Sequence, residues 1–578
     1  MASLLSEFPP IRTETWEKAI RDDLKGADYA DKLIWRSPEG IDVKPYYRAE
    51  DLAGLEFVNT APGEFPYVRG TRGSGGWRIR EEIDIVDAEE ANSAARCAAA
   101  AGAEEIAFTR AVVANASDLG ILVANLGEIP LRFEDASATT VRLVLERMTV
   151  RQSGTMRSTD RDWRADPAFS ADAISKAPTG FVPFTIRAEE FQEESASAVE
   201  EVGYALAAGV DFLAEMQQRG VSIDRAADSI IFSFAMGPEY FMQIAKLRAF
   251  RMAWAQVVRT FGGSRDHAKA QIYARSAQWD RTIYDPQVNI LRATTEAMSA
   301  VLGGADSVCV APFDGCYRQA NESSRRLARN TQIILKQEAE LARVADPGGG
   351  SYYLEALTDS IARKAWKLLQ DVEASGVDGK AADSIAKTLA VRKTAQDKAV
   401  VNRHRVLTGT NRFADPKERA LDRIDYPFTN DTSRAAAPFE ELRLRTESWI
   451  AKTGQGPRIV LAEIGDPKMR AARSNFVADF LACAGLVTEI RQFGAAAQIG
   501  AAEADLIVVC SSDPEYVAIA TEMLAEMRSR GSEVPVLIAG NPESSEQLRA
   551  AGITDFIHLR SNPIELLTRL QKILGIGK

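Results

Sequence analysis

Residues 228–259 read DSIIFSFAMGPEYFMQIAKLRAFRMAWAQVVR and join a short apolar run to a long amphipathic stretch. The run DSIIFSFAM (228–236) has the length and composition of a buried strand, whereas apolar residues in Glu239–Arg259 recur at intervals of three and four, as in a helix. A buried strand followed by a helix is the unit from which parallel sheets are built. This stretch therefore predicts an α/β fold.

The same alternation extends from Trp77 to about Thr394. Further apolar runs expected to be strands are EEIAFTR (104–110), LGILVAN (119–125), TGFVPFTIRA (179–188) and ADSVCVAPFD (305–314). Strand–helix alternation over roughly three hundred residues favours a (β/α)8 TIM barrel. An open doubly wound sheet is the alternative.

Composition divides the chain into four parts. Residues 1–50 predict an N-terminal arm that wraps a larger body, with a helix at Thr13–Gly26, and residues 51–400 predict the barrel. Residues 401–456 are polar and rich in Pro, Ala and Gly, which is typical of a linker belt. Residues 457–578 predict a second domain.

The second domain repeats the strand–helix alternation on a smaller scale. Its five expected strands are PRIVLAEIG (457–465), VTEIRQF (487–493), ADLIVVCSS (504–512), VPVLIAG (534–540) and DFIHL (555–559). Five strands with intervening helices fit a flavodoxin-like doubly wound sheet. Neither G-x-x-x-x-G-K-[ST] nor G-x-G-x-x-G follows any strand, so nucleotide chemistry is not supported.

Composition excludes several classes of protein. Hydrophobic residues make up 46% and charged residues 26% of the 578 residues, which is typical of a folded soluble protein. A net charge of −11 argues against nucleic-acid binding, and no apolar run approaches the ~20 residues of a membrane helix. The five scattered cysteines and the absence of a secretory signal predict reduced thiols and a cytoplasmic location.

Several stretches resemble the methylmalonyl-CoA mutase family. The most specific is RLARNTQIILKQEAELARVADPGGGSYYLEALTD (Arg326–Asp359), with its N-T-Q and D-P-x-x-G-S-x-Y elements. Other similar stretches are YDPQVNILRATTEAM (284–298), YFMQIAKLRAFRMAW (240–254), VLTGTNRF (406–413) and WEKAIRDDLKG (16–26). The resemblance implies an acyl-CoA mutase barrel followed by a cobalamin-binding type of domain, with adenosylcobalamin supplying the radical chemistry.

The family's cobalt ligand is a histidine in an Asp-x-His-x-x-Gly motif after the first strand of the second domain. Anchored on Asp466, the motif places Lys468 at the histidine and Ala471 at the glycine; a shift by one residue places Met469 and Ala472 there. Protonated lysine has no lone pair to offer. The family's lysine at the end of that strand aligns with Glu463. We therefore expect no cofactor-binding and no metal-binding residue on this chain.

The chain contains three histidines. His267 and His404 lie in polar segments, whereas His558 follows the fifth strand of the second domain, near the edge where ligands bind in such sheets. No carboxylate partner for His558 is evident, so we interpret it as a surface or hydrogen-bonded histidine. A ligand role for His558 stays open at this point.

The barrel also lacks the side chains that the resemblance implies for catalysis. Glu189 and Glu190 fall where active members carry Tyr-His after the strand FVPFTIRA, and Tyr273 and Arg275 replace a His-x-Gln pair. Glu189 and Glu190 are adjacent, so on a strand they would point to opposite faces, and we interpret them as degenerate, with a repurposed base as the alternative. We expect no catalytic residue on this chain.

The loop that caps the reacting carbons in active members is shorter here. Residues 67–77 read YVRGTRGSGGW, without the family's tyrosine. A glycine-rich loop can cradle phosphate, but without a following helix start that signal is weak. The remaining matches, the Asp346-Pro347-Gly348-Gly349-Gly350 turn and Asn330-Thr331-Gln332, are expected to be architectural, and Asp285 and Arg292 are expected to pair across a helix start.

The resemblance together with these losses implies a small, non-catalytic subunit. Its expected partner is the catalytic large subunit, which would bind adenosylcobalamin and interconvert (R)-methylmalonyl-CoA and succinyl-CoA in a pseudo-symmetric heterodimer. Two alternatives are a self-sufficient acyl-CoA mutase with a rewired site and a scaffold for a mutase-reactivating partner.

Overall fold

The strand and helix predicted within 228–259 are β8 (Ile230–Met236) and α10 (Tyr240–Thr260) in a computed structural model of the protein. Every residue of β8 is buried, and α10 packs against α8 (Ala198–Gln218) and α13 (Tyr352–Ala374). The structure describes residues 11–110, 113–134, 138–147, 154–156, 164, 166–177, 181–375, 380–425 and 434–577.

The first sheet contains eight parallel strands in the order β6-β5-β4-β3-β10-β9-β8-β7. Its remaining strands are β3 (Arg78–Ile83), β4 (Glu105–Phe108), β5 (Leu131–Phe133), β6 (Gly154–Met156), β7 (Phe184–Arg187), β9 (Ile272–Ser276) and β10 (Ser307–Cys309). Because the last strand, β10, pairs with the first, β3, the sheet curls, and its hydrogen-bonded order starts at β6 and ends at β7. This order is consistent with a TIM-like barrel and not with a doubly wound sheet, whose strand order reverses part-way.

Helices alternate with these strands along the chain. Their bounds are α3 (Ala88–Ala100), α4 (Ala116–Leu122), α5 (Ala138–Arg147), α6 (Pro167–Lys176), α7 (Ala188–Glu193), α9 (Ile223–Asp228), α11 (Val288–Leu302), α12 (Glu322–Ile333) and α14 (Lys380–Val401), with a π-helical turn at Ile334–Glu338. Most of the predicted alternation is therefore confirmed.

One predicted strand is wrong. LGILVAN (119–125) lies mostly on the helix α4. The strand of this repeat is β5, which begins at Leu131, twelve residues after Leu119. The helix begins because the Asn115 side chain accepts hydrogen bonds from the backbone N–H groups of Ser117 and Asp118. A short apolar run fits a buried helix as well as a buried strand, and the cap decides between them.

Aromatic packing fixes β8 between α8 and α10. The ring of Trp254 on α10 meets that of Phe232 on β8 edge to face, with centroids 4.7 Å apart. Gly209 on α8 makes this approach possible, because a Cβ there would lie 2.5 Å from the Trp254 ring. The strand and the helix predicted in residues 228–259 therefore lie at the centre of the main hydrophobic core.

Buried ion pairs join the D-P-G-G-G turn to this core, as the architectural interpretation predicted. Arg248 on α10 is completely buried and pairs with Asp346 in the turn and with Glu355 on α13, the latter at 2.6 Å. Arg69 pairs with the same two carboxylates at 2.8 and 2.9 Å. Two arginines and two carboxylates therefore connect the loop that contains Arg69, the helix α10 and the start of α13.

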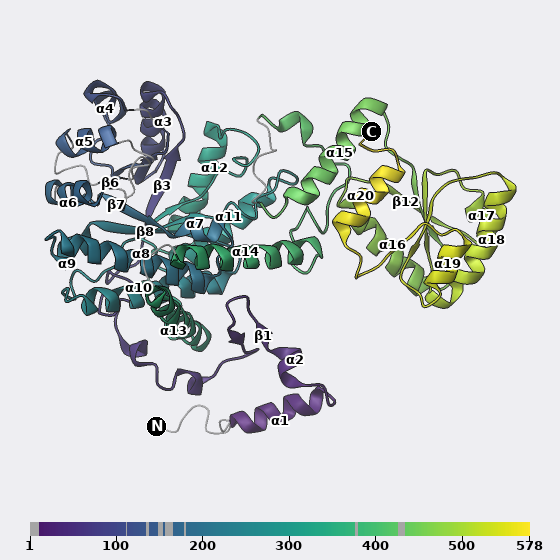
Figure 1. Ribbon diagram of the computed structural model, residues 1–578, viewed down its shortest axis with the longest axis horizontal. Coiled ribbons are helices and arrows are strands. Elements are labelled where there is room, and N and C mark those ends of the chain that lie inside the picture. Colours follow the sequence, from purple (N-terminus) through teal and green to yellow (C-terminus); the bar gives the residue numbers. More distant parts are fainter. Residues whose placement is uncertain are drawn as a thin grey trace.

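The second sheet has five parallel strands in the order β12-β11-β13-β14-β15. Its elements are β11 (Ile459–Glu463), α16 (Pro467–Ala482), β12 (Thr488–Gln492), α17 (Ala496–Gly500), β13 (Leu506–Cys510), α18 (Tyr516–Ser529), β14 (Val536–Ala539), α19 (Ser545–Ala551), β15 (Asp555–Ile557) and α20 (Pro563–Ile573). Successive buried residues of β11 pack to opposite faces, one covered by α16 and α20 and the other by α17, α18 and α19 (Figure 1). The 2-1-3-4-5 order is consistent with a flavodoxin-like domain.

The N-terminal segment reaches away from the rest of the molecule (Figure 1). It holds α1 (Thr13–Asp23), α2 (Tyr29–Leu33) and a two-stranded ladder of β1 (Trp35–Arg36) and β2 (Asp42–Val43). The helix predicted at Thr13–Gly26 is confirmed, and none of its residues is buried within this chain. The segment is anchored at its base, where the rings of Tyr47 and Tyr353 lie 5.0 Å apart.

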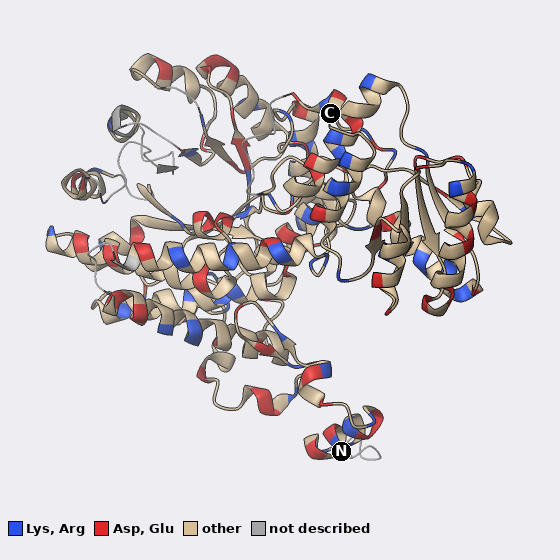
Figure 2. Ribbon diagram, turned by 45° about the vertical axis from the view of Figure 1, so that its right-hand side comes forward, with Lys and Arg blue, Asp and Glu red and all other residues tan. Residues whose placement is uncertain are grey.

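The surface carries both signs of charge. In Figure 2, acidic and basic positions are interspersed along the outer helices. In the part of the chain that the structure describes, no helix combines the length and the apolar character needed to cross a bilayer.

Replacing Arg248 should destabilise the fold. Arg248→Ala leaves two buried carboxylates with Arg69 as their remaining partner, and we expect a loss of about 3–5 kcal/mol in the free energy of unfolding. Urea unfolding followed by circular dichroism measures it. The matched control is Arg363→Ala on α13, whose side chain is 71% exposed in its pair with Asp359 and should matter by less than about 0.5 kcal/mol. Equal effects of the two variants would contradict the assignment.

Candidate functional site

Charged side chains fill the interior of the curled sheet. Arg80 on β3 is 2% exposed; it pairs with Glu134, and its Nη1 lies 3.9 Å from Glu105. Glu105 on β4 is completely buried and accepts hydrogen bonds from Arg132 and from the hydroxyl of Ser307, the latter at 2.9 Å. Burial raises the pKa of Glu105, but Arg132 and Arg80 outweigh it and hold this pKa below its usual value.

Tyr273 and Arg275 lie on β9 and continue this filling. The Tyr273 hydroxyl donates to Glu82 at 2.8 Å, and the Arg80 guanidinium lies 3.7 Å from the centre of the Tyr273 ring. The ring also packs on Ile231 and Cys309, in a small apolar cluster inside the sheet. Burial raises the pKa of the Tyr273 hydroxyl, so it stays protonated and serves as a donor. These side chains contact each other inside the curled sheet.

Glu189 and Glu190 lie on the first turn of α7 and not on a strand. The prediction that their side chains point to opposite faces of a strand was therefore wrong. Glu189 is 3% exposed and accepts from the Ser233 hydroxyl and from Arg187, whose Nε lies at 3.1 Å. Glu190 has a side chain that is 52% exposed and pairs with the same Arg187. One arginine thus neutralises part of both charges, and the two carboxylates point into different surroundings.

The glycine-rich loop at 70–76 packs against carbonyl oxygens. A Cβ at Gly75 would lie 2.6 Å from the carbonyl oxygen of Val344 and 2.7 Å from that of Ala342. Phosphate binding needs converging N–H donors, whereas this loop meets acceptors. The close approach requires glycine at position 75, whereas Gly70 and Gly76 have φ angles of +106° and +107°, which favour glycine.

At the carboxyl end of β11, the Asp466 side chain caps a helix. It accepts the backbone N–H of Met469 at 2.7 Å, and Pro467 occupies the first turn of α16. Lys468 lies exposed on the same turn. The carboxylate that would orient a ligand in this position therefore already serves the helix.

A second carboxylate, that of the partly exposed Glu515, lies at the carboxyl ends of β11 and β13. Oε2 of Glu515 accepts hydrogen bonds from the hydroxyls of Ser511 and Ser512, both at 2.6 Å, and from the backbone N–H of Asp466 at 3.2 Å. These hydrogen bonds, the one from Ser511 first, lower the pKa of Glu515 to about 2. In a sheet of this order the crevice between the first and third strands is where ligands bind, and here Glu515 lies in it.

His558 lies beside a cavity at the ends of β14 and β15. Its Nδ1 accepts the backbone N–H of Arg560 at 3.1 Å, so the neutral ring carries its proton on Nε2. Burial and the nearby Arg560 lower the pKa of His558, which favours this neutral form. The cavity of about 560 Å³ is also lined by Phe476 and Asn541. A protonated Nε2 donates hydrogen bonds and offers no lone pair to a metal.

The other two histidines lie in loops of the first domain and of the segment that follows it. Nδ1 of His267 is 2.6 Å from Asp228, in a loop ahead of β9, and His404 is exposed in the segment after α14. Among the described residues, no three His, Cys, Asp or Glu side chains are grouped to hold a metal ion.

The comparisons with known proteins agree with this fold. The methylmalonyl-CoA mutase family model matches residues 36–117 and 170–450. A methylmalonyl-CoA mutase small subunit of Porphyromonas gingivalis is 34% identical over 619 aligned positions that cover 99% of both chains. The chain belongs to the methylmalonyl-CoA mutase family.

Two further relatives show how the family is organised. A small subunit of Streptomyces virginiae is 29% identical and covers 100% of this chain and 98% of its own. A methylmalonyl-CoA mutase large subunit of Porphyromonas gingivalis is 30% identical, over 71% of this chain and 65% of that subunit. The similarity to the small subunits is therefore end to end, whereas the similarity to the large subunit is partial.

The methylmalonyl-CoA mutase family uses adenosylcobalamin, and the residues at the edge of β11 do not fit this group. At the position expected for the cobalt ligand stands Lys468, or Met469 if the motif is shifted by one residue, and neither is an imidazole. The Asp466 carboxylate caps α16, and Glu515 lies at the carboxyl ends of β11 and β13. Glu463 is 5% exposed and accepts from Ser474 at 2.5 Å and from Gln492 at 3.2 Å, so it belongs to the packing of the strand end.

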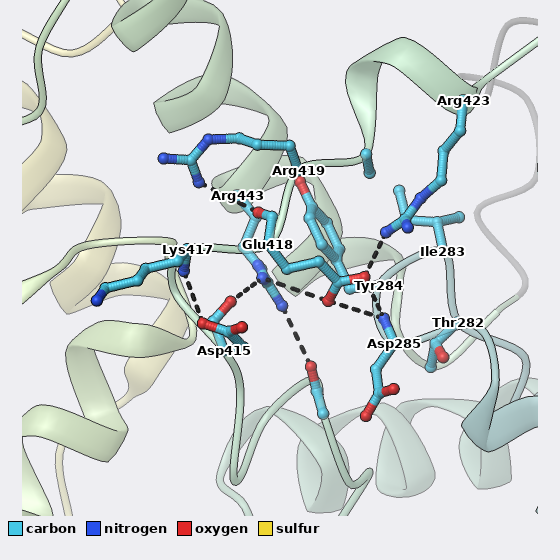
Figure 3. Close-up of polar contacts among 12 residues, drawn as sticks. Thr282, Ile283, Tyr284, Asp285, Asp415, Lys417, Glu418, Arg419, Arg423 and Arg443 are labelled. Atoms are coloured by element: carbon cyan, nitrogen blue, oxygen red, sulfur yellow. Dashed lines mark hydrogen bonds and ion pairs between the residues drawn. The ribbon is translucent and has the colours of Figure 1, made fainter.

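The family segment YDPQVNILRATTEAM is architectural, but through different contacts from the predicted one. Arg292 donates to Thr282, to Asn289 at 2.8 Å and to the backbone oxygen of Thr408, and no ion pair with Asp285 occurs among the described residues. Instead, the backbone N–H of Asp285 donates to Glu418 at 2.8 and 2.9 Å (Figure 3). The loop after β9 is therefore tied to residues beyond 400.

Sequence reasoning missed a buried polar cluster between the two domains. Residues 401–456 include α15 (Ala437–Thr453), and its side chains Arg443 and Glu447 are 1% and 4% exposed. Arg443 stacks on the ring of Tyr284 (Figure 3). The hydroxyl of Tyr284 donates to Glu447. The signal was the helical spacing in FEELRLRTESW (439–449), which the polar composition of the segment obscured.

The Glu105 network should make stability depend on pH. Glu105→Gln leaves Arg80 and Arg132 partly unpaired and should cost about 3–5 kcal/mol at pH 7. The pKa of Glu105 is lowered in the folded state. Its contribution to the free energy of unfolding is therefore present above the unfolded-state pKa of about 4.3 and is lost as the pH falls below that value. The urea midpoint of the wild type should therefore fall more steeply with acid than that of the variant. Glu503→Gln, at a side chain 88% exposed, is the control and should keep the wild-type slope.

Proposed function

We propose that this chain is the small, non-catalytic subunit of an adenosylcobalamin-dependent methylmalonyl-CoA mutase. In this proposal the chain keeps the (β/α)8 barrel and the flavodoxin-like domain of the family, while its own charged groups occupy the barrel interior and the carboxyl ends of β11 and β13. The cavity of about 560 Å³ beside His558 stays open. The observation that carries the proposal is the interior of the barrel, where the chain's own charged groups pair with one another, Arg80 with Glu134 and Arg132 with Glu105. The partner is a large subunit that binds the cofactor and interconverts methylmalonyl-CoA and succinyl-CoA.

The filled barrel would exclude substrate for an energetic reason. An acyl-CoA threaded through the sheet would have to displace Tyr273 and separate buried ion pairs, and breaking one such pair costs about 3–5 kcal/mol. The end-to-end similarity to proteins named small subunit supports the same proposal. So does the existence of a separately named large subunit in one of those organisms.

The N-terminal arm is the proposed contact with the large subunit. Trp16 on α1 is 44% exposed, and its ring lies 5.5 Å from that of Tyr46 in the same arm. No residue of α1 is buried, so its apolar face has free area for a second protein. In a pseudo-symmetric heterodimer such an arm would lie across the partner.

Co-expression with the large subunit tests the proposal. We expect a 1:1 complex on gel filtration, with mutase activity that the small subunit alone lacks, because the reacting groups lie in the partner. Trp16→Ala combined with Ile20→Asp should weaken the complex at least about tenfold, by removing ~1.4 kcal/mol or more of apolar contact. Glu14→Ala on the same helix is the control and should leave it intact. Separate elution of the two wild-type chains, or recovery of this chain only with a mutase-reactivating protein, would contradict the proposal.

Cobalamin titration of the purified chain separates it from a self-sufficient mutase. We expect no change in the visible spectrum of adenosylcobalamin, and none for Lys468→His, because Asp466 caps α16 and cannot orient the new imidazole. The purified large subunit is the positive control. Tight binding by the wild-type chain would favour a self-sufficient enzyme with a rewired site.

A further inference from the structure

The geometry points to α15 as a clamp that locks the second domain to the barrel in one orientation. The inference concerns this chain by itself and holds whether or not it has a partner. In Figure 1, α15 lies between the two bodies of the molecule. Its opposite sides carry two different sets of buried contacts.

The side of α15 toward the barrel carries Glu440, Arg443 and Glu447, spaced three and four residues apart on one helical face. Glu440 accepts the backbone N–H of Ile283, in the loop after β9, at 2.8 Å. It also pairs with Arg434 at 2.7 Å. Both Glu440 and Arg434 are 2% exposed, so these contacts are withdrawn from water.

Glu447 accepts from three donors on this side. They are the hydroxyl of Tyr284 and the backbone N–H groups of Ala420 and Leu421, which lie 2.9 and 3.2 Å from Oε2. A buried carboxylate with several fixed donors is costly to expose and has one favourable position. The loop after β9 is thereby fixed to the helix.

The side of α15 toward the second domain carries Leu442 and Thr446. Gln571 on α20 is completely buried, and its Nε2 donates to the backbone oxygen of Leu442 at 2.7 Å and to Thr446 at 2.8 Å. The Thr446 hydroxyl donates to the backbone oxygen of Ala484 at 2.7 Å. Leu442 also lies in the hydrophobic core that α16 and α20 share.

The segment after α14 forms a second tie to the same domain. Asp479 on α16 pairs with Arg403 and accepts the backbone N–H of Phe413 at 2.7 Å. Asn411 is completely buried and holds this segment together through the backbone groups of Val400 and Leu407, at 2.9 and 2.7 Å. A hinge needs residues free to change their φ and ψ angles, whereas these are held by buried partners.

Distance measurement by electron spin resonance tests the clamp. Nitroxide labels on Lys367→Cys and Glu503→Cys, side chains 69% and 88% exposed on the two bodies, report their separation in a Cys97→Ser background. We expect a single narrow distance distribution, unchanged when the large subunit is added. A broad or two-peaked distribution for the wild type would overturn the inference, even if no complex with a large subunit exists.

Variants assign the rigidity to α15. Glu447→Gln should abolish the single narrow distribution, whereas Glu441→Gln, at a side chain 74% exposed on the same helix, should preserve it. Asp479→Asn loosens the second tie and provides an independent variant if Glu447→Gln does not fold. A narrow distribution in a folded Glu447→Gln or Asp479→Asn protein would show that the clamp lies elsewhere and would overturn the assignment.

Discussion

The structure depends on the requirement that charges inside a protein be paired. Arg80, Glu105 and Arg132 lie where a barrel interior must be filled with side chains, and none of them can be removed without leaving a partner unpaired. The same requirement fixes Arg248 against Asp346 and Glu355 on the outside of the sheet. Paired charges therefore stabilise both the interior of the curled sheet and the packing of α10 against α13.

The second domain also carries charged groups of its own at the edge where sheets of this order bind ligands. Its strand order creates a crevice at the carboxyl ends of β11 and β13, and the chain places its own carboxylates there. Asp466 caps α16, and Glu515 gathers two hydroxyls and a backbone N–H. Both carboxylates accept hydrogen bonds at the start of a helix, so they stabilise the fold at this end of the sheet.

Between the two domains, buried polar side chains connect α15 to both sides. Glu440, Arg443 and Glu447 connect α15 to loops of the barrel, and Gln571 connects it to the second domain. Directional hydrogen bonds define orientation more narrowly than apolar contact, which tolerates sliding. These hydrogen bonds therefore restrict the orientation of α15 relative to the segments that it contacts.

The sequence by itself determined the strand–helix alternation, the five strands of the second domain and the loss of the cobalt motif at Asp466–Lys468, because these depend on local periodicity and residue type. It misjudged LGILVAN, where a cap at Asn115 decided for helix, and Glu189–Glu190, which lie on a helix turn. The pairing of Arg80 with Glu134, the Asp285–Glu418 contact and the Tyr284–Glu447 contact were decided only by the tertiary structure. These partners are 54 to 163 residues apart, and no local pattern relates side chains that only the closing of the sheet and the docking of α15 bring together.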